Sequence, residues 1–506
     1  MRIECQDWPV GTATRLAALA ILLAGLAGAQ ALDGRRAYVE RCGGCHGEDG
    51  RGGGHGPRIV EPAHSRAATR DAVRSLILRG IPDGGMPAFA ISNAEADAIA
   101  AHVMTLRAAG NAAAPPAARV RDLPFAEIAY AGSGAWPTYH GNLSGNRFSP
   151  LRQIDTGNVA RLVPRWMFPI RGRGALQTTP LVVDGVMYVT AANEAYALDA
   201  RTGHEVWHYS HPRSQGLAGD AGGGINRGAA LLGGRLFMVT DNAHLLALDR
   251  ASGKLLWDVE MADSRVNYGS TSAPLVVDDL VVAGVSGGDE GVRGFLAAYR
   301  ASTGERAWRF WTIPAPGEPG SETWSGRALE HGCGSTWLTG TYDPESRLLY
   351  WPTGNPCPDY NGDERKGDNL YTSSVLALEP ATGKLRWYYQ FTPHDVHDWD
   401  AAQTPLLVDA VFHGQPRKLL VHGNRNGFFY VLDRLTGKLL LAEPFVRRIT
   451  WASGIGADGR PKLLAGNEPT EEGQLVCPSV AGAANWPSNA YDPATGLFYF
   501  FAEESC

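Results

Sequence analysis

The 506-residue sequence is poor in several residue classes, and each scarcity excludes a class of protein. Seven cysteines are too few for a scaffold held together by dense disulfides. A net charge of −6 leaves no basic excess of the kind that nucleic-acid-binding proteins carry, so no nucleic-acid partner is expected. Glycine, with 62 residues, and tryptophan, with 14, are abundant, which suits a turn-rich β-protein pinned by aromatic side chains.

The apolar run Leu16–Ala31 is shorter than the ~20 residues that span a membrane. It ends in Ala29-Gln30-Ala31, which has the form of a signal-peptide cleavage site. We therefore expect residues 1–31 to be a signal peptide, with an uncleaved N-terminal anchor as the alternative. In both cases the mature body is expected outside the cytoplasm, in the periplasm.

Residues 32–107 contain Cys42-Gly43-Gly44-Cys45-His46, the C-x-x-C-H motif that attaches c-type haem. Cys42 and Cys45 would bond to the haem vinyl groups, and His46 would ligate the iron. A glycine- and proline-rich loop presents Met86, whose thioether suits the second axial position. A zinc or redox site at C-x-x-C is the alternative.

Two helices are expected around this motif, Ala37–Glu40 before it and Ile91–Leu106 after it, the second capped by Ser92 or Asn93. The span then resembles a small all-α cytochrome c domain. Residues 108–134 are rich in alanine and proline without periodicity, so we expect a linker there.

A short pattern recurs in the remaining chain, residues 135–506. It reads ALDARTGHEVW at Ala197–Trp207 and returns after fifty, fifty, eighty and fifty-four residues, with a leucine in place of tryptophan in the last copy. Each copy reads as strand, Thr-Gly or Ser-Gly turn, and strand. Repetition at this period predicts an all-β propeller, with a β-sandwich of chance similarity as the alternative.

The segment Trp136-Pro137-x-Tyr139 and the Thr-Gly-x3-Trp repeats resemble those of pyrroloquinoline quinone (PQQ)-dependent dehydrogenases, from Trp136 to the end. The resemblance implies an eight-bladed propeller with PQQ and a metal ion on its axis. Because Tyr491–Phe500 opens another blade and the sequence stops at Cys506, we expect about five blades and part of a sixth here. This chain alone is therefore expected to bind PQQ poorly.

Trp337 lies outside the repeat register and matches the family tryptophan that stacks on the quinone; another blade-pinning tryptophan is the alternative. Arg227 matches the arginine that pairs with a PQQ carboxylate, and Arg425 matches the cation against the reactive carbonyl. The resemblance implies further PQQ contacts at Gln177, Thr271, Ser286, Ser335, Asn485 and Trp486.

A carboxylate is needed to take the substrate's hydroxyl proton, and Asp398 aligns with the family base, although Asp395 and Asp400 compete for the role. Hard cations prefer oxygen donors. The resemblance implies a calcium or lanthanide site with these ligands: Asp289 in place of the usual glutamate, or its neighbour Glu290; Asn355; Asp398; and Asp400, which is associated with lanthanide use.

Alcohol dehydrogenases of the family often carry two adjacent cysteines where this chain has Ala221-Gly222, which favours a sugar or polyol over methanol. The pairing of Cys333, Cys357 and Cys477 stays open at this point. The prediction is a quinohaemoprotein dehydrogenase that oxidises an alcohol or sugar hydroxyl and passes electrons through haem to a cytochrome or quinone. The alternatives are a non-catalytic envelope propeller scaffold and a truncated remnant that holds haem alone.

Overall fold

The computed structural model describes residues 33–50, 52, 56, 59–60, 67–82, 85–110, 120–132, 134–170 and 175–506. The predicted signal or anchor segment 1–31 and part of the predicted linker lie outside these residues. Within the described ranges, no helix combines the length and apolarity needed to cross a bilayer.

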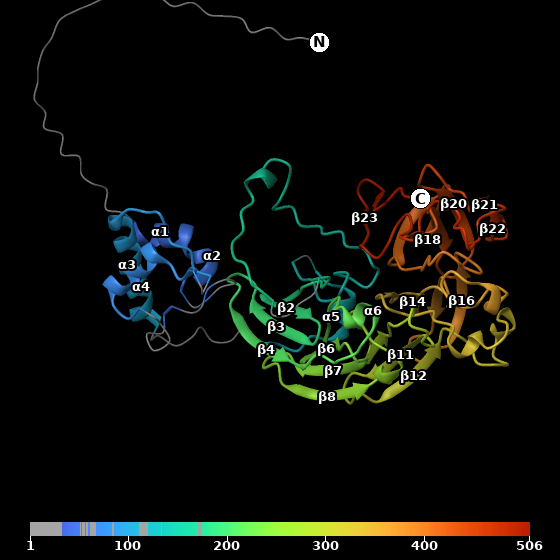
Figure 1. The fold of residues 1–506 in the computed structure, drawn as a ribbon, viewed down its shortest axis with the longest axis horizontal. Coiled ribbons are helices and arrows are strands. Elements are labelled where there is room, and N and C mark those ends of the chain that lie inside the picture. Colours follow the sequence, from blue (N-terminus) through green and yellow to red (C-terminus); the bar gives the residue numbers. More distant parts are fainter. Residues whose placement is uncertain are drawn as a thin grey trace, which may run out of the picture.

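A helical unit comes first, and Figure 1 shows it in blue beside the strands. Asp33, Thr69 and Ser92 cap three of its helices by accepting backbone N–H groups. Ser92 Oγ accepts from Glu95 N at 3.1 Å, so the cap of the last helix is Ser92 rather than Asn93. The helices are α1 (Gly34–Arg41), α2 (Gly43–His46), α3 (Arg70–Arg79) and α4 (Asn93–Gly110).

The helices pack through one small apolar core. Tyr38 of α1, Ile77 of α3 and Ile99 of α4 are buried in it. Cys42 belongs to the same cluster, and Met86 packs against it from the loop after α3. The haem-attachment motif and the loop with the predicted second ligand therefore meet at one core.

The rest of the described chain is almost entirely β-structure. Five antiparallel sheets have four strands each, with neighbours in sequence paired in space. The first two comprise β1 (Leu181–Val183), β2 (Val186–Ala191), β3 (Glu194–Asp199), β4 (Glu205–Ser210), and β5 (Ala230–Leu232), β6 (Arg235–Val239), β7 (His244–Asp249), β8 (Leu255–Glu260). The third comprises β9 (Leu275–Val277), β10 (Leu280–Gly284), β11 (Phe295–Arg300), β12 (Arg306–Trp311).

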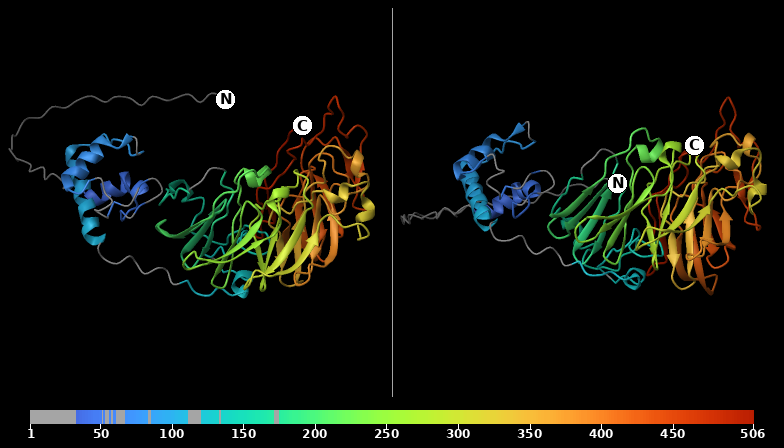
Figure 2. Two further views of the ribbon diagram at one scale, coloured as in Figure 1. Left: turned by 60° about the horizontal axis from the view of Figure 1, so that its bottom comes forward. Right: turned by 90° about the horizontal axis from the view of Figure 1, so that it is seen from below.

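The fourth and fifth four-stranded sheets comprise β13 (Thr341–Asp343), β14 (Leu348–Pro352), β15 (Ser374–Leu378), β16 (Leu385–Gln390), and β17 (Leu406–Phe412), β18 (Gln415–Gly423), β19 (Phe428–Asp433), β20 (Leu439–Pro444). Two hairpins follow, β21 (Ala452–Ile455) with β22 (Pro461–Leu463), and β23 (Ala490–Asp492) with β24 (Leu497–Tyr499). Figures 1 and 2 show the successive sheets side by side along an arc, which confirms the predicted propeller architecture.

Short helical segments interrupt the strands. They are the helices α5 (Phe125–Ala129) and α6 (Gly219–Gly222) and the 3-10 turns η3 (Val159–Arg161), η4 (Ser264–Val266), η5 (Ser321–Thr323), η6 (Ala328–Glu330) and η7 (Asp363–Arg365).

The recurring tryptophan joins each sheet to the next. Trp207 on β4 donates from Nε1 to Arg250 O at 2.9 Å, in the turn between β7 and β8. Gly253 in that turn has φ 71°, and a Cβ there would lie 2.6 Å from the Trp207 ring. The same pairing recurs along the chain: Trp257 to Ala301 O (3.2 Å) over Gly304, and Trp308 to Pro380 O (2.7 Å) over Gly383. The Thr-Gly-x3-Trp repeat is thus a contact between neighbouring sheets.

A second regularity lies within each sheet. The pairing of the third and fourth strands shifts register at one position, between Ala197 and Leu198 in the first sheet and between Ala377 and Leu378 in the fourth. The equivalent shift occurs in the other three four-stranded sheets. Such a bulge increases the local twist of the strands, and here it recurs at the same place in the repeat.

Two disulfides cross-link the propeller. Cys333 pairs with Cys357, with a Cα–Cα distance of 5.3 Å, and Cys477 pairs with Cys506 at 4.4 Å. The structure therefore gives the pairing that the sequence left open. Cys42 and Cys45 form no disulfide.

Candidate active site

The haem-attachment motif occupies the short helix α2 and the residue before it. His46 is the fourth residue after Cys42, an offset close to one helical turn. Burial raises the pKa of the Cys42 thiol to about 11. Gly56 packs against the His46 ring: a Cβ at that glycine would lie 2.6 Å from His46 Nδ1. Free thiols at Cys42 and Cys45, a histidine on the next turn and Met86 at the same core fit a covalent c-type haem.

The predicted PQQ and metal residues occupy loops at one end of the sheets. In an antiparallel four-stranded sheet, the loop before the first strand and the loop between the second and third strands lie at the same end. Both loop types carry the predicted residues. The loops before first strands hold Arg227, Thr271, Trp337, Asp398 and Trp486, and those between second and third strands hold Asp289, Asn355 and Arg425.

Trp337 lies at the centre of a chain of contacts. The guanidinium carbon of Arg227 lies 4.6 Å from the centroid of the Trp337 ring and 5.6 Å from that of Trp486. Arg227 also donates from Nη1 to Thr271 Oγ1 at 2.7 Å. On the other side, Trp337 Nε1 donates to Asp400 Oδ2 at 3.1 Å. Four predicted residues from different loops therefore meet around one half-buried indole ring.

Arg425 continues this chain of contacts. Its Nη1 donates to Asp400 Oδ2 at 3.2 Å, and its Nη2 donates to Asp398 Oδ2 at 3.3 Å. Nη2 also donates to the backbone oxygen of Val480 at 2.7 Å. Burial raises the pKa values of both Asp398 and Asp400, repulsion from Asp400 adds to the effect on Asp398 and repulsion from Asp289 to that on Asp400, and the charge of Arg425 only partly offsets this. Two buried carboxylates beside one cation create a site that favours a further positive charge.

Asp395 differs from the other carboxylates of its loop. It accepts the backbone N–H groups of His397 at 3.0 Å and Trp399 at 2.7 Å. The indole of Trp399 is fully buried and packs edge-on against Trp451, with ring centroids 5.2 Å apart. Asp395 thus holds the loop together, whereas Asp398, at φ 61°, lies with Arg425. Of the three competing carboxylates, the geometry places Asp398 and Asp400 in the cluster.

Asn355 is held by both its backbone and its side chain. Its backbone N–H donates to Asp400 Oδ1 at 2.5 Å, and its Nδ2 donates to Asp359 Oδ1 at 2.7 Å. Burial, followed by the charge of Asp289, raises the pKa of Asp359 to about 6. Asp359 thereby joins a group of carboxylates that the sequence did not connect with it.

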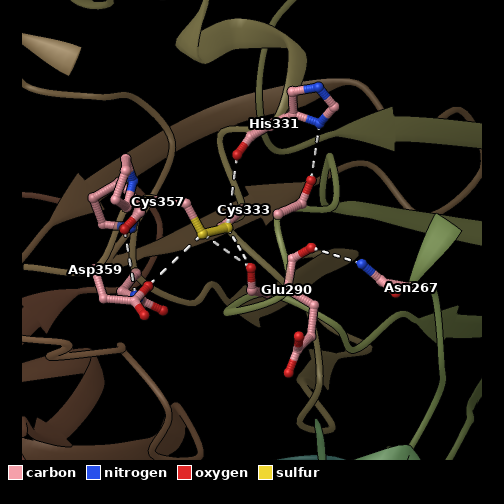
Figure 3. Close-up of a disulfide and its surroundings, with 12 residues drawn as sticks. Asn267, Glu290, His331, Cys333, Cys357 and Asp359 are labelled. Carbon is pink, nitrogen blue, oxygen red and sulfur yellow. Dashed lines mark hydrogen bonds between the residues drawn. A yellow bond between two sulfur atoms is a disulfide. The ribbon is translucent and has the colours of Figure 1, made fainter. Parts of the chain in front are cut away.

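Asp289 lies at the accessible rim of this group. It is exposed to solvent, yet surrounding protein still raises its pKa, with Glu290 adding to the effect and Arg425 opposing it. Glu290 is turned elsewhere: its backbone oxygen accepts from Asn267 Nδ2 at 3.1 Å (Figure 3). Its side chain lies near Gly219, where Oε1 would be 3.4 Å from an added Cβ. The geometry favours Asp289 over the fallback Glu290.

Fewer contacts connect the remaining predicted PQQ residues with this cluster. Ser335 Oγ would lie 2.7 Å from a Cβ at Gly288, next to Asp289, and Ser335 O accepts from Gly354 N at 2.8 Å. Asn485 bonds only locally, to Ala481 O and to the backbone of Trp486. Among the described residues, the side chain of Gln177 forms no hydrogen bond with the cluster, although the backbone N–H of nearby Thr179 donates to Arg227 O at 3.1 Å.

Unpaired polar atoms test whether the residues suit PQQ. Among the described residues, no partner is found for four buried atoms in this region: Gln177 Oε1, Arg227 Nε, Ser286 Oγ and Arg425 Nε. Buried polar atoms normally have partners. Three of the four can donate hydrogen bonds, which matches the carboxylates and carbonyls of a tricyclic quinone, and the Trp337 ring offers an aromatic face. The residues fit the cofactor.

The side chains present satisfy a metal ion only in part. Within the part of the chain that the structure describes, no three His, Cys, Asp or Glu side chains form a metal-binding cluster by themselves. Any cation here therefore needs other oxygens as well, such as the Asn355 amide or the cofactor's own groups. The carboxylates themselves favour a bound cation, because Asp289, Asp398 and Asp400 all have raised pKa values, which a nearby positive charge would lower.

Two residues of this region were missed from the sequence. Asp220 on α6 accepts from Arg227 Nη2 at 3.2 Å, and Asp359 accepts from Asn355. Both lie within seven residues of a predicted site residue, so acidic residues in the same loop were an available signal. Nothing in the sequence marked the backbone oxygen of Val480, which comes from a distant loop.

Comparison with known proteins supports this organisation. Residues 136–444 match the PQQ family model described as glucose/ethanol/alcohol dehydrogenase, β-propeller domain. Residues 29–103 match the family model for cytochrome c oxidase, cbb3-type, subunit III.

Among curated relatives, the quinohemoprotein alcohol dehydrogenase ADH IIB of Pseudomonas putida is 40% identical over 393 residues, which cover 73% of this chain and 56% of that protein. The lanthanide-dependent methanol dehydrogenase of Methylacidiphilum fumariolicum is 38% identical over 400 residues, covering 74% of this chain and 65% of that protein. The chain thus spans little more than half to two thirds of these relatives.

Among solved structures, the quinohemoprotein alcohol dehydrogenase ADHIIG from Pseudomonas putida HK5 superposes with a TM-score of 0.72 at 37% identity, covering 76% of this chain and 59% of that one. The matched family model covers more than half of the sequence. The chain therefore belongs to the PQQ-dependent glucose/ethanol/alcohol dehydrogenase β-propeller family, and a cytochrome c domain precedes its propeller.

Proposed function

We propose that this protein oxidises an alcohol with bound PQQ and passes the electrons to a c-type haem in the same chain. The observation that carries the proposal is the continuous chain of contacts from Thr271 and Arg227 through Trp337 and Asp400 to Arg425 and Asp398. The names of the relatives above support an alcohol substrate.

PQQ, when bound, supplies an acceptor for the hydride that leaves the alcohol carbon and carries two electrons with it. Trp337 would stack on its ring system, and Arg227 with Thr271 would bind its carboxylates. Ser286, Ser335, Gln177, Asn485 and Trp486 complete the proposed contacts. Arg425 would place its positive charge at the reacting carbonyl, where negative charge develops.

Asp398 would remove the proton from the substrate hydroxyl. A general base must be unprotonated to act, and burial beside Asp400 opposes this by raising its pKa. Arg425 at 3.3 Å and a bound cation both favour the charged carboxylate. The cation would therefore serve the base as well as the cofactor.

Asp289, Asn355, Asp398 and Asp400 would hold that cation, which is calcium or a lanthanide. A trivalent ion gains more than a divalent one from an additional carboxylate, and Asp400 supplies it. One relative is named as lanthanide-dependent, which keeps both ions in the proposal.

The helical unit would hold the haem. Cys42 and Cys45 would form the thioether bonds, and His46 and Met86 would be the axial ligands. Electrons would leave to a cytochrome or quinone acceptor. The periplasm is the proposed location, supported by the signal-type segment and by two disulfides, which persist in oxidising compartments.

One anaerobic experiment tests the whole proposal. The haem-loaded protein is mixed with calcium chloride, ethanol and PQQ in large excess, because this chain alone is expected to bind PQQ poorly, and reduction is followed in the haem absorption bands. We expect reduction only when all three are present. Failure to reduce haem that dithionite does reduce, despite bound PQQ, would contradict the proposed electron route.

A matched spectrum tests the haem ligands. In Met86→Ala, the low-spin ferric spectrum and any sulfur-to-iron band should weaken. An unchanged spectrum would assign the sixth ligand to another residue.

A further inference from the structure

The side-chain amide of Asn355 is held in one orientation. Its Nδ2 lies 2.7 Å from Asp359 Oδ1 and 3.4 Å from the backbone oxygen of Pro356. A carboxylate and a carbonyl both accept hydrogen bonds, so the NH2 end of the amide must face them. Because the amide is planar, its carbonyl oxygen then faces away from Asp359. The asparagine is 1% exposed, so the surrounding protein also restricts its rotation.

Asp359 is itself fixed from two directions. Cys357, two residues earlier, is cross-linked to Cys333, and Cys357 Sγ lies 3.7 Å from Asp359 Oδ1. Figure 3 shows the Asp359 carboxylate beside this disulfide. The buried Arg365 donates from Nη2 to Pro358 O at 2.8 Å and to Asp359 O at 3.3 Å. The turn from Asn355 to Asp359 is thus fixed both by the hydrogen bonds from Arg365 to its backbone and by the disulfide.

The disulfide also connects this turn with the other loops of the site. Cys333 pairs through its backbone with Pro356 and with Arg293, and it lies four residues before Trp337. Cys357 Sγ lies 3.0 Å from the backbone oxygen of Gly288, which precedes Asp289. The loops of Asp289, Trp337 and Asn355 therefore share one cross-linked point.

We propose that Asp359 is a positioning residue that turns the carbonyl oxygen of Asn355 toward the cation, with the Cys333–Cys357 disulfide holding Asp359 in place. The inference rests on the proposed function, because it assumes that Asn355 is a cation ligand. Asp359 acts through Asn355 and touches neither substrate nor cofactor. Partners that orient a metal ligand are typically worth about 10–100-fold in metal affinity.

Two substitutions separate orientation from charge. Asp359→Asn keeps an oxygen that can accept from Asn355 but removes the negative charge. Asp359→Ala removes both. The matched control is Asp363→Ala, which removes an exposed carboxylate four residues further along the same loop.

The measurement is the calcium affinity of the PQQ-loaded protein, determined by calorimetric titration with calcium chloride, together with the melting temperature of the metal-free protein. We expect Asp359→Ala to weaken calcium binding about 10–100-fold, and Asp359→Asn and Asp363→Ala to stay within a few-fold of the parent. The metal-free melting temperature should be unchanged. In an Asn355→Ala background, Asp359→Ala should have no further effect.

The outcomes distinguish failure of the cation site from failure of the positioning role of Asp359. If the parent binds neither calcium nor lanthanum, or if Asn355→Ala binds the cation as tightly as the parent, the proposed cation site fails and the positioning role fails with it. If that site holds but Asp359→Ala keeps full affinity, only the positioning role is overturned. Equal weakening by Asp359→Asn and Asp359→Ala would assign the effect to charge, and a lowered metal-free melting temperature would assign it to folding; both contradict the proposal.

Discussion

The two ends of each four-stranded sheet are built from different kinds of sequence. At one end, the turn between the third and fourth strands repeats almost unchanged, with a glycine at positive φ beneath the tryptophan of the neighbouring sheet. At the other end, the loops differ in length and composition from sheet to sheet, and they carry Trp337, Asp398 and Arg425. The first end, called the repeated end below, joins neighbouring sheets. The second, called the chemical end, brings charged side chains together.

The difference teaches that stability and chemistry are supplied by separate parts of the same sheets. The chemical end holds residues that cost free energy, including non-glycine residues at positive φ such as Cys333 (65°) and Asp398 (61°). It also holds carboxylates with raised pKa values. The repeated end offers packed indole rings, and those of Trp207, Trp257 and Trp308 also have satisfied N–H groups. Substitutions at the two ends should therefore affect different measurements.

The largest effect is expected from Asp398→Asn at the chemical end. Removing a general base lowers turnover by about 10²–10⁴-fold. Stability should be preserved, because asparagine tolerates the φ of 61° at this position. Turnover with PQQ and calcium and the melting temperature are both measured.

Asp395→Asn is the control for that prediction. It weakens the hydrogen bonds to His397 N and Trp399 N, so the melting temperature should fall. Normal turnover in Asp398→Asn together with inactive, stable Asp395→Asn would exchange the roles of the two residues.

Next comes Trp308→Ala at the repeated end, which should lower the free energy of unfolding by about 3–5 kcal/mol. The buried ring loses its contact with Gly383 and its 2.7 Å hydrogen bond to Pro380 O. Denaturant unfolding measures the loss, while turnover of the folded fraction should stay within a few-fold of the parent.

A pair of phenylalanine variants isolates the hydrogen bond. Trp387 packs on Gly437, but its Nε1 has no partner in the described part of the chain. Trp308→Phe should therefore cost about 1 kcal/mol more than Trp387→Phe. Equal costs would show that ring packing alone joins the sheets.

A smaller effect is expected from Asp400→Asn. This change removes one charge near the proposed cation and keeps one acceptor oxygen, which can serve either Trp337 Nε1 or Asn355 N but not both. Affinity for lanthanum should fall more than affinity for calcium, within a range of about 10–100-fold. Titrations of the PQQ-loaded protein with each ion measure the ratio. If calcium supports full activity and Asp400→Asn leaves it unaffected, lanthanide use is excluded as the role of this residue.

A further effect concerns acid stability. His422 on β18 is fully buried and stacks on Phe391 with ring centroids 4.4 Å apart, and burial lowers its pKa to about 3. The folded state therefore favours the neutral ring, so its contribution is complete above pH ~6.5 and is lost as pH falls toward 3. At pH 5 the loss is at most about 2 kcal/mol.

Melting curves between pH 7 and pH 5 measure this loss. His422→Gln should flatten the dependence of melting temperature on pH, whereas His413→Asn, at an exposed hairpin turn, should leave it unchanged. An unaltered slope in His422→Gln would assign the acid sensitivity to other buried groups.

The repeated end was predictable because its determinants are local. Turn residues and a tryptophan at fixed spacing occur within eleven residues, so the strands and turns follow from the sequence directly. What the sequence did not show is where each tryptophan goes. Trp308 reaches an acceptor 72 residues away, a contact that exists only once two sheets have packed.

The chemical end was only partly predictable. Resemblance pointed to Asp398, Asn355 and Arg425, and the structure brings these loops together. The composition of the loop alone could not separate Asp395 from Asp398, because the difference between them depends on which backbone N–H groups the folded loop presents. Asp359 was missed for the same reason: its relation to Asn355 depends on a turn closed by a disulfide whose pairing the sequence left open.

The tryptophan–glycine contact has a consequence for how such a chain can change by insertion. The interval between the third and fourth copies of the repeat is eighty residues instead of fifty, because residues 312–340, between β12 and β13, and residues 353–373, between β14 and β15, both form longer segments than their counterparts in the other sheets. Trp308 still reaches Pro380, so the spacing of neighbouring sheets is unaffected by what is inserted between them. Loops at the chemical end can therefore gain or lose residues, and with them new side chains, while the alignment of the sheets is inherited intact.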